Sequence, residues 1–166
     1  MKPKLVYERE LPTIKIPKDF VLIQDTREQK AMFAPDETVV EKALKTGDYS
    51  VVGFEDIVTI ERKSVPDLFG SVKRPHFEKR IERMKKMEWA GLLIEGTEDL
   101  VMTKQQYGKV GPKTVYGALA SYEIQGIHVY FARRPRDARF WVLSRLIKFW
   151  DHFRRGKNGK SKARKA

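Results

Sequence analysis

The stretch GDYSVVGFEDIVTIERKSVPD, residues 47–67, contains the strongest fold signal in the chain. Residues 48–52 and 57–63 are both rich in β-branched and aromatic side chains, and residues 53–56 between them begin with a glycine and include two acidic residues. Two such runs joined by a short polar segment are typical of two antiparallel strands and their turn. The stretch therefore predicts a β-hairpin.

The polar residues of this hairpin predict a cation site. In an extended strand side chains alternate between faces, so Glu61 and Lys63 point the same way, roughly 7 Å apart, and Arg62 points the opposite way. Antiparallel pairing brings Asp48, at the start of the first strand, close to Glu61. Two neighbouring carboxylates repel each other unless a cation lies between them, and Mg²⁺ or Mn²⁺ suits such an oxygen-rich pair. A plain cross-strand salt bridge between Glu61 and Lys63 is the alternative.

The end of the stretch predicts a helix start. Ser64 can act as the N-cap, Pro66 lies in the first turn and Asp67 is an acidic residue at the third helical position. A purely capping role for Asp67 therefore stays open. Arg62 could pair with Asp67 or Glu28 and hold the hairpin to this helix.

A basic amphipathic segment follows at residues 73–86, where Phe77, Ile81 and Met84 recur at helical spacing. Its basic side chains either form an ordinary solvated helix face or contact a phosphate backbone.

The remaining segments complete an α/β pattern. We expect strands at residues 20–24, 90–95 and 127–131, helices at 111–123 and 135–153, and a short helix or irregular structure at 39–45. This order predicts a mixed central sheet flanked by helices on both faces.

Composition limits the chain's size class and partners. The 166 residues are enough for one domain, and an excess of 34 Lys and Arg over 22 Asp and Glu gives a net charge of +12. Such a charge indicates nucleic acid or, failing that, an acidic membrane surface as the partner. The absence of cysteine excludes disulfides, thiolate zinc sites and cysteine nucleophiles.

The charge and proline distribution divides the chain. Residues 1–18 contain three prolines and should form an extended lead-in or an edge strand. Residues 19–153 form the folded body. Residues 154–166 contain seven basic residues and no acidic ones, which predicts a disordered basic arm that either contacts phosphate or only aids solubility. We see neither a secretion signal nor an apolar membrane span, so we expect an intracellular, cytoplasmic or nucleoid-associated location.

Three sequence blocks together resemble a known family. They are DTRE at residues 25–28, GD at 47–48 and ERKxxxD at 61–67. The last two resemble the GD…ERKxxxD motif of the XPF-type structure-specific endonucleases, and the Asp then Glu-x-Lys pattern is similar to that of the restriction-endonuclease-like PD-(D/E)xK superfamily. The resemblance covers about residues 20–153 and implies a restriction-endonuclease-like fold.

The resemblance also implies residue roles. Asp48 and Glu61 would bind Mg²⁺ or Mn²⁺ with Asp25 as a further carboxylate, and Lys63 would orient or activate the attacking water. The polar set around the scissile phosphate would be Arg27, Glu28, Arg62 and Asp67. Asp25 and Glu28 could instead be ordinary loop residues. The candidates for DNA contact are Arg27, Glu28, Lys73, Arg74, His76, Lys79, Arg80 and Arg83.

The implied activity is endonucleolytic hydrolysis of DNA, with a preference for branched, flapped or forked structures in replication, recombination or repair. Two departures from the family pattern stand out. The Gln that usually follows an Arg after the ERKxxxD helix is replaced by Glu78 or a neighbour, and a tandem helix-hairpin-helix module is missing, so a targeting protein could replace it. A catalytically silent DNA-binding or scaffold subunit, or a restriction-like or general nuclease on the same fold, is the alternative.

The last helix is unusually apolar. Trp141, Leu146 and Phe149 extend beyond the face marked by its other apolar residues, and such an excess often indicates an interface. The family resemblance implies dimerisation through this domain, so we expect a homodimer through residues 136–153. A deeply buried helix is the alternative.

Overall fold

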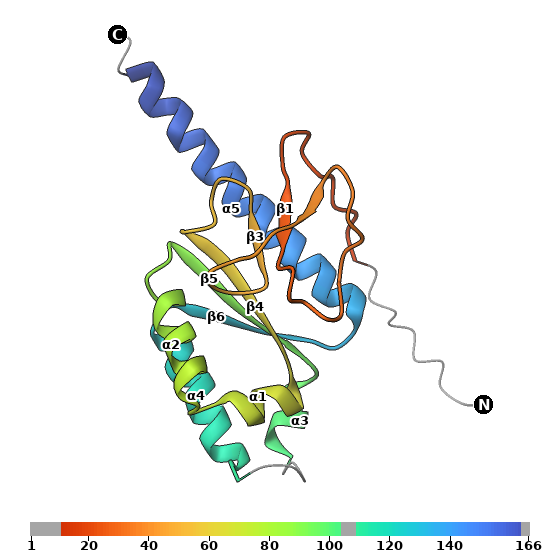
Figure 1. Ribbon diagram of the computed structural model, residues 1–166, viewed down its shortest axis with the longest axis vertical. Helices are drawn as coiled ribbons and strands as arrows, with labels where there is room; N and C mark the ends of the chain where they lie inside the picture. Colours follow the sequence, from red (N-terminus) through yellow and green to blue (C-terminus); the bar gives the residue numbers. More distant parts are fainter. Residues whose placement is uncertain (1–10, 104–108, 164–166) are drawn as a thin grey trace, which may run out of the picture.

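The computed structural model describes residues 11–103 and 109–163 (Figure 1). Within these ranges six strands form one mixed sheet in the order β2–β1–β3–β4–β5–β6. The strands are β1 (Leu22–Gln24), β2 (Val39–Glu41), β3 (Tyr49–Val51), β4 (Val58–Ser64), β5 (Trp89–Glu95) and β6 (Ile127–Ala132). The helices are α1 (Val65–Ser71), α2 (Pro75–Met84), α3 (Glu98–Met102), α4 (Pro112–Ile124) and α5 (Pro135–Ala163).

The predicted hairpin is the centre of the sheet. β3 pairs antiparallel with β4, with Tyr49 opposite Ile60, and β1 pairs antiparallel with the other edge of β3. β4, β5 and β6 then run parallel to one another, because the helices after β4 and β5 return the chain to the starting edge of the sheet. The α/β class with a mixed sheet is confirmed.

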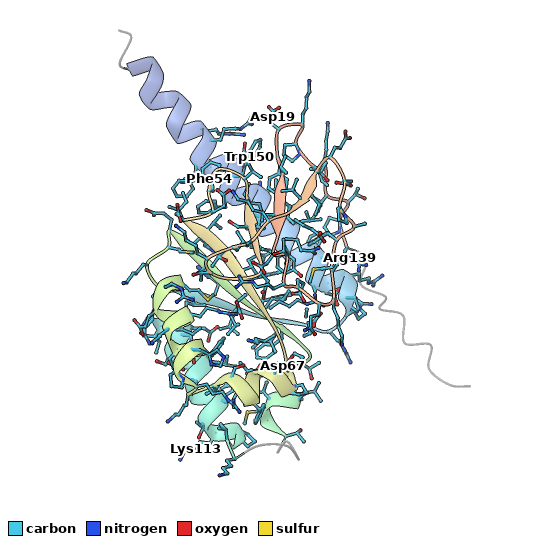
Figure 2. The ribbon with its side chains drawn as sticks, in the orientation of Figure 1. Asp19, Phe54, Asp67, Lys113, Arg139 and Trp150 are labelled. Carbon is cyan, nitrogen blue, oxygen red and sulfur yellow. The ribbon has the colours of Figure 1, made fainter. Side chains whose placement is uncertain are left out.

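Helices cover both faces of the sheet (Figure 1). Side chains alternate along β5, so Leu93 packs in one buried cluster with α5, while Leu92 and Ile94 pack in another with α1, α2 and α4. On the α5 face, Trp150 meets Phe20 edge to face with ring centroids 5.9 Å apart. The helix crosses the sheet past the β3–β4 turn, near the Phe54 and Trp150 labelled in Figure 2.

Three segments differ from the sequence-based predictions. Of the segment 39–45, expected as a short helix or irregular structure, Val39–Glu41 forms an edge strand, because Val39 pairs in parallel with Leu22 of the apolar strand β1, and residues 42–45 are irregular. The short helix α3 is additional. The sequence predicts a disordered arm from residue 154, but helix α5 continues to Ala163. An i,i+4 ion pair between Arg155 and Asp151, at 2.9 Å, stabilises the helix at the start of this segment.

The structure describes only part of the predicted N-terminal lead-in. Residues 11–17 carry no regular secondary structure, and residues 1–10 lie outside the described part. Among the described residues, no helix combines the length and apolarity needed to span a bilayer.

Gly91 gives a test of the packing under α5. A Cβ atom there would lie 2.6 Å from the ring of Trp141 and 2.9 Å from that of Trp89, and Trp141 is also stacked on Tyr130 with centroids 5.0 Å apart. We expect Gly91→Ala to lower the free energy of unfolding by about 1–3 kcal/mol, because the rings cannot retreat without breaking this stack. Urea unfolding measures the effect.

The matched control is Gly117→Ala in α4, where nothing lies within 4 Å of the added methyl. It should raise the free energy of unfolding by about 0.5–1 kcal/mol, because alanine favours the helical state. Equal effects at the two glycines would contradict this account of the α5 face.

Candidate active site

The hairpin register places Asp48 beside Glu61. The Asp48 N–H donates to the Ile60 carbonyl at 2.8 Å, and Asp48 Oδ2 accepts the Arg62 N–H at 2.7 Å. The Asp48 carboxylate is therefore held against the backbone of β4 at the position of Glu61.

Gly47 makes this approach possible. Its φ of +80° lies in the left-handed region, and a Cβ there would lie 1.9 Å from Thr59 Oγ1. A side chain at residue 47 would therefore both strain the backbone and push the strand away from β4. This explains physically why Gly precedes Asp in the motif.

Glu61 is the central group of the site. It is only 1% exposed, and its Oε1 accepts from Arg80 Nη1 at 2.5 Å and lies 3.5 Å from Lys63 Nζ. Its other oxygen, Oε2, is buried without a hydrogen-bond partner. A buried carboxylate oxygen left unpaired is costly, so this atom is suited to an additional cationic partner.

Lys63 shares this face, as the strand alternation predicts. Its Nζ lies 5.2 Å from the centroid of the Phe77 ring, and its side chain is 18% exposed. The ammonium group is thus held between a buried carboxylate and an aromatic face at the edge of the site.

Asp48 and Glu61 repel each other electrostatically. Burial, and next the negative charge of Glu61, raise the pKa of Asp48 from its ordinary 3.8 to about 7, against the opposing Arg62 N–H and the positive charge of Arg80. The surroundings of Asp48 therefore oppose its ionisation, mainly because it is buried.

Asp25 is close to the site but fully engaged. Its N–H donates to the Asp48 carbonyl at 2.8 Å. Burial opposes ionisation of its carboxyl, but hydrogen bonds from Arg27 and from the Leu44 N–H outweigh burial and lower the pKa to about 2. Because both oxygens accept these bonds, the contacts of Asp25 are those of a residue that fixes the loop before the site.

Arg62 points to the opposite face and ties three segments together. Its Nη2 donates to Glu95 Oε1 at 2.7 Å, its Nη1 donates to the Lys30 carbonyl at 2.5 Å, and Glu28 Oε1 lies 3.7 Å away. Of the partners open from sequence, the structure shows Glu28 and not Asp67. A polar cleft of about 340 Å³ lies here, lined by Arg27, Glu28, Gln29, Lys30, Arg62, Ser64, Asp67 and Glu95.

Asp67 has the capping role that the sequence left open. The Ser64 Oγ accepts the Asp67 N–H at 3.2 Å and donates to Asp67 Oδ2 at 2.7 Å. Asp67 is exposed at the start of α1 (Figure 2), so it faces the polar cleft rather than Glu61.

The basic candidates divide into two groups. Four side chains are exposed around the start of α2, namely Lys73, Arg74, His76 and Lys79. Arg80 instead pairs with Glu61, and Arg83 Nε donates to Thr46 Oγ1 at 2.8 Å.

The sequence reasoning therefore missed Arg80 as a partner of the acidic site. The signal was present, because Arg80 follows Phe77 by three residues and precedes Ile81, next to the buried stripe of α2. Two further contacts were not predicted: Thr46 with Arg83, and Glu78 Oε1 accepting from the Tyr122 hydroxyl of α4 at 2.9 Å.

The residues fit a small, hard cation held by few protein ligands. Within residues 11–103 and 109–163, no group of three or more His, Cys, Asp or Glu could hold a metal ion. Mg²⁺ often takes only one or two carboxylates and completes its shell with water and phosphate oxygens. Asp48 and the unpaired Glu61 Oε2 meet that requirement.

Comparisons with known proteins show the family and agree with the fold. A family model described as "ERCC4 domain" matches residues 24–144. Among solved structures, the chain is similar to XPF from Aeropyrum pernix with a TM-score of 0.58 and 19% identity, over 81% of this chain and 68% of that one. This likeness concerns the fold. No curated protein sequence matches the chain significantly.

Because the Asp48 carboxylate is buried beside Glu61, we expect the stability of the metal-free protein to depend on pH. Because the pKa of Asp48 is about 7 in the folded protein and 3.8 ordinarily, folding keeps a proton that the unfolded chain loses. The protonated Asp48 carboxyl therefore contributes fully to the free energy of unfolding below about pH 4. This contribution falls as the pH rises and is lost above about pH 7. Asp48→Asn, which keeps an acceptor for the Arg62 N–H, should therefore stabilise the protein at pH 8 by on the order of 1–2 kcal/mol.

Thermal unfolding in EDTA at pH 4 and pH 8 measures this difference. The variant and the wild type should unfold at nearly the same temperature at pH 4. A stabilisation that is equal at both pH values would show that charge repulsion is not its cause.

Proposed function

This chain belongs to the ERCC4 domain family, which is a nuclease family, and from that membership we propose that it is a metal-dependent endodeoxyribonuclease. The proposed substrate is DNA, with branched, flapped or forked structures preferred, in replication, recombination or repair. The cofactor is Mg²⁺ or Mn²⁺. We also propose that the protein is intracellular.

One observation carries the proposal. In the family's own motif, the buried Glu61 has one oxygen facing Arg80 and Lys63 and a second oxygen without any hydrogen-bond partner. A structural salt bridge on a solvated face would be exposed, whereas Glu61 is 1% exposed. An acidic group kept buried and unsatisfied costs stability, which is typical of functional sites.

Asp48 and Glu61 would hold the metal. When bound, the ion would polarise the phosphodiester, lower the pKa of its water and offset charge on the leaving 3′-oxygen. The Gly47 turn and the Arg62 N–H fix the Asp48 carboxylate, so little reorganisation is needed. Asp25, whose oxygens are engaged by Arg27 and Leu44, acts in this proposal as a positioning residue for the loop rather than as a third ligand.

Lys63 would act on the attacking water and the phosphate. Its ammonium lies 3.5 Å from Glu61, close enough to orient a water at the edge of the carboxylate pair. It also supplies positive charge where negative charge develops on the phosphate oxygens.

DNA would approach over the start of α2 and the polar cleft. The exposed basic side chains there are sequence-independent phosphate contacts, and affinity should fall steeply with salt. Arg27, which is 69% exposed beyond its pair with Asp25, extends this surface. We also propose that a partner protein directs the enzyme to its DNA substrate.

We also propose a homodimer through α5. The apolar excess noted in the sequence is mostly used inside the domain, since Trp141, Leu146 and Phe149 are buried. What supports dimerisation is the family resemblance and an apolar cleft of about 540 Å³ beside α5, lined by Glu88, Trp89, Ser144, Arg145, Lys148, Phe149, His152 and Phe153.

The silent-subunit alternative is less favoured, because such a subunit has no use for a buried unsatisfied carboxylate beside a lysine. A restriction-like or general nuclease on the same fold would share this site and differ only in substrate. The choice of DNA substrate separates it from the proposed structure-specific enzyme.

The catalytic assignment predicts loss of cleavage in three variants. Asp48→Asn, Glu61→Gln and Lys63→Met should each lower the cleavage rate with Mg²⁺ or Mn²⁺ by at least about 100-fold, because the first two weaken the proposed metal site and the third removes positive charge beside the reacting phosphate. The assay uses labelled flap, fork, four-way-junction and linear duplex DNA.

Lys113→Met, on an exposed lysine in the first turn of α4, is the matched control and should cleave at the wild-type rate. DNA affinity of the three variants should stay within a few-fold of wild type. Wild-type cleavage by Asp48→Asn would reject the site, and equal cleavage of all four DNAs would favour the general nuclease.

The proposed dimer predicts a molar mass near twice 19.4 kDa by light scattering at micromolar concentration. Phe153→Glu, at the edge of the apolar cleft, should shift the mass toward the monomer, because burying a charge in an interface is unfavourable. A wild-type monomer at this concentration would exclude the dimer.

A further inference from the structure

Arg80 lies where the positive charge of a metal ion would be needed. Its Nη1 bonds Glu61 Oε1 at 2.5 Å, the closest charge contact of that carboxylate. The same guanidinium acts on Asp48, since its positive charge opposes the rise in the pKa of that carboxyl. One side chain from α2 thus partly neutralises both acidic groups.

The charges of the site balance without a metal. Asp48 and Glu61 bring two negative charges, and Lys63 and Arg80 bring two positive charges. A divalent ion added to this set makes the site strongly positive as long as Arg80 stays in place, and like charges at such distances repel. Metal binding and the Arg80–Glu61 pair therefore oppose each other.

Arg80 can leave Glu61 without moving the helix. Its side chain is 30% exposed, whereas Glu61 is 1% exposed, so rotation carries the guanidinium toward solvent. The backbone of α2 is fixed independently by the buried side chains of Phe77 and Ile81 and by the hydrogen bond from the Tyr122 hydroxyl to Glu78.

We propose that Arg80 is an exchangeable counter-cation that holds Glu61 inward in the metal-free protein and competes with the divalent metal for it. This inference rests on the proposed metal-dependent function. It assigns Arg80 a positioning role at the acidic site, in addition to any contact with DNA. A metal then binds only as the ion pair opens, so the pair lowers the affinity for metal.

Mn²⁺ affinity in the absence of DNA tests this competition. Arg80→Gln should bind Mn²⁺ about five- to tenfold more tightly than wild type, as measured by calorimetry or by the electron paramagnetic resonance of free Mn²⁺. Lys79→Gln removes the same charge from the adjacent exposed position, and screening at 0.15 M salt should leave its affinity near wild type. Arg80→Lys keeps a cation, so its affinity for Mn²⁺ should stay close to that of wild type.

A second measurement follows thermal unfolding. In EDTA, Arg80→Gln should unfold at a lower temperature than Lys79→Gln, because Glu61 loses its closest partner. Added Mn²⁺ should raise the unfolding temperature of Arg80→Gln more than that of wild type. Circular dichroism verifies that each variant is folded, and Arg80→Met, which also removes the cation, carries the test if Arg80→Gln is not.

The outcomes separate this inference from the proposed function. If wild type binds no Mn²⁺, the metal-dependent function fails and this inference fails with it. If wild type binds Mn²⁺ and Arg80→Gln binds it no more tightly than Lys79→Gln, only the competition is overturned. An Arg80→Lys affinity equal to that of Arg80→Gln would also overturn it, because a retained cation should still compete.

Discussion

A buried pair of carboxylates, one of which has an unpaired oxygen, is the constraint on which the site depends. Glu61 is almost completely buried and has one unpaired oxygen, and Asp48 is held against it by the backbone of β4. Burying negative charge is unfavourable unless a partner neutralises it. The cations Lys63 and Arg80 reduce this cost, and the unpaired Glu61 Oε2 is where we propose that a divalent ion binds.

The mixed sheet is what brings these groups together. The antiparallel hairpin aligns Asp48 with Glu61, and the parallel strands β4, β5 and β6 require return helices that cover the faces. One of them, α2, packs over the Glu61 and Lys63 side of β4 and so delivers Arg80. The other side of β4 carries Arg62, whose bonds to Glu95 and Lys30 fix the loop after β1. Opposite faces of one strand thus separate the acidic site from its structural support.

The sequence-based predictions agree best with the structure where residues near in sequence follow a known pattern, such as strand alternation or helix capping. The hairpin, the Ser64 N-cap and the shared face of Glu61 and Lys63 follow from period-two alternation and capping, and the structure shows them. The edge strand β2 was missed because its three residues carry little local signal and form a strand only by pairing with β1. The helical continuation past residue 153 was missed because basic, glycine-containing sequence has weak intrinsic preferences, and an attached helix can extend through it.

The sequence by itself determined which chemical groups are present and in what order: two acids and a lysine on a hairpin, followed by a basic helix, in a pattern that identified the family. Only the tertiary structure decided how those groups share charge. Whether Arg80 faces solvent or Glu61, and whether the Asp25 oxygens are free or bonded by Arg27 and Leu44, depends on how α2 and the loops pack. Periodicity fixes the face of an element on which a residue lies, whereas ion pairs across elements depend on distances that no local pattern encodes.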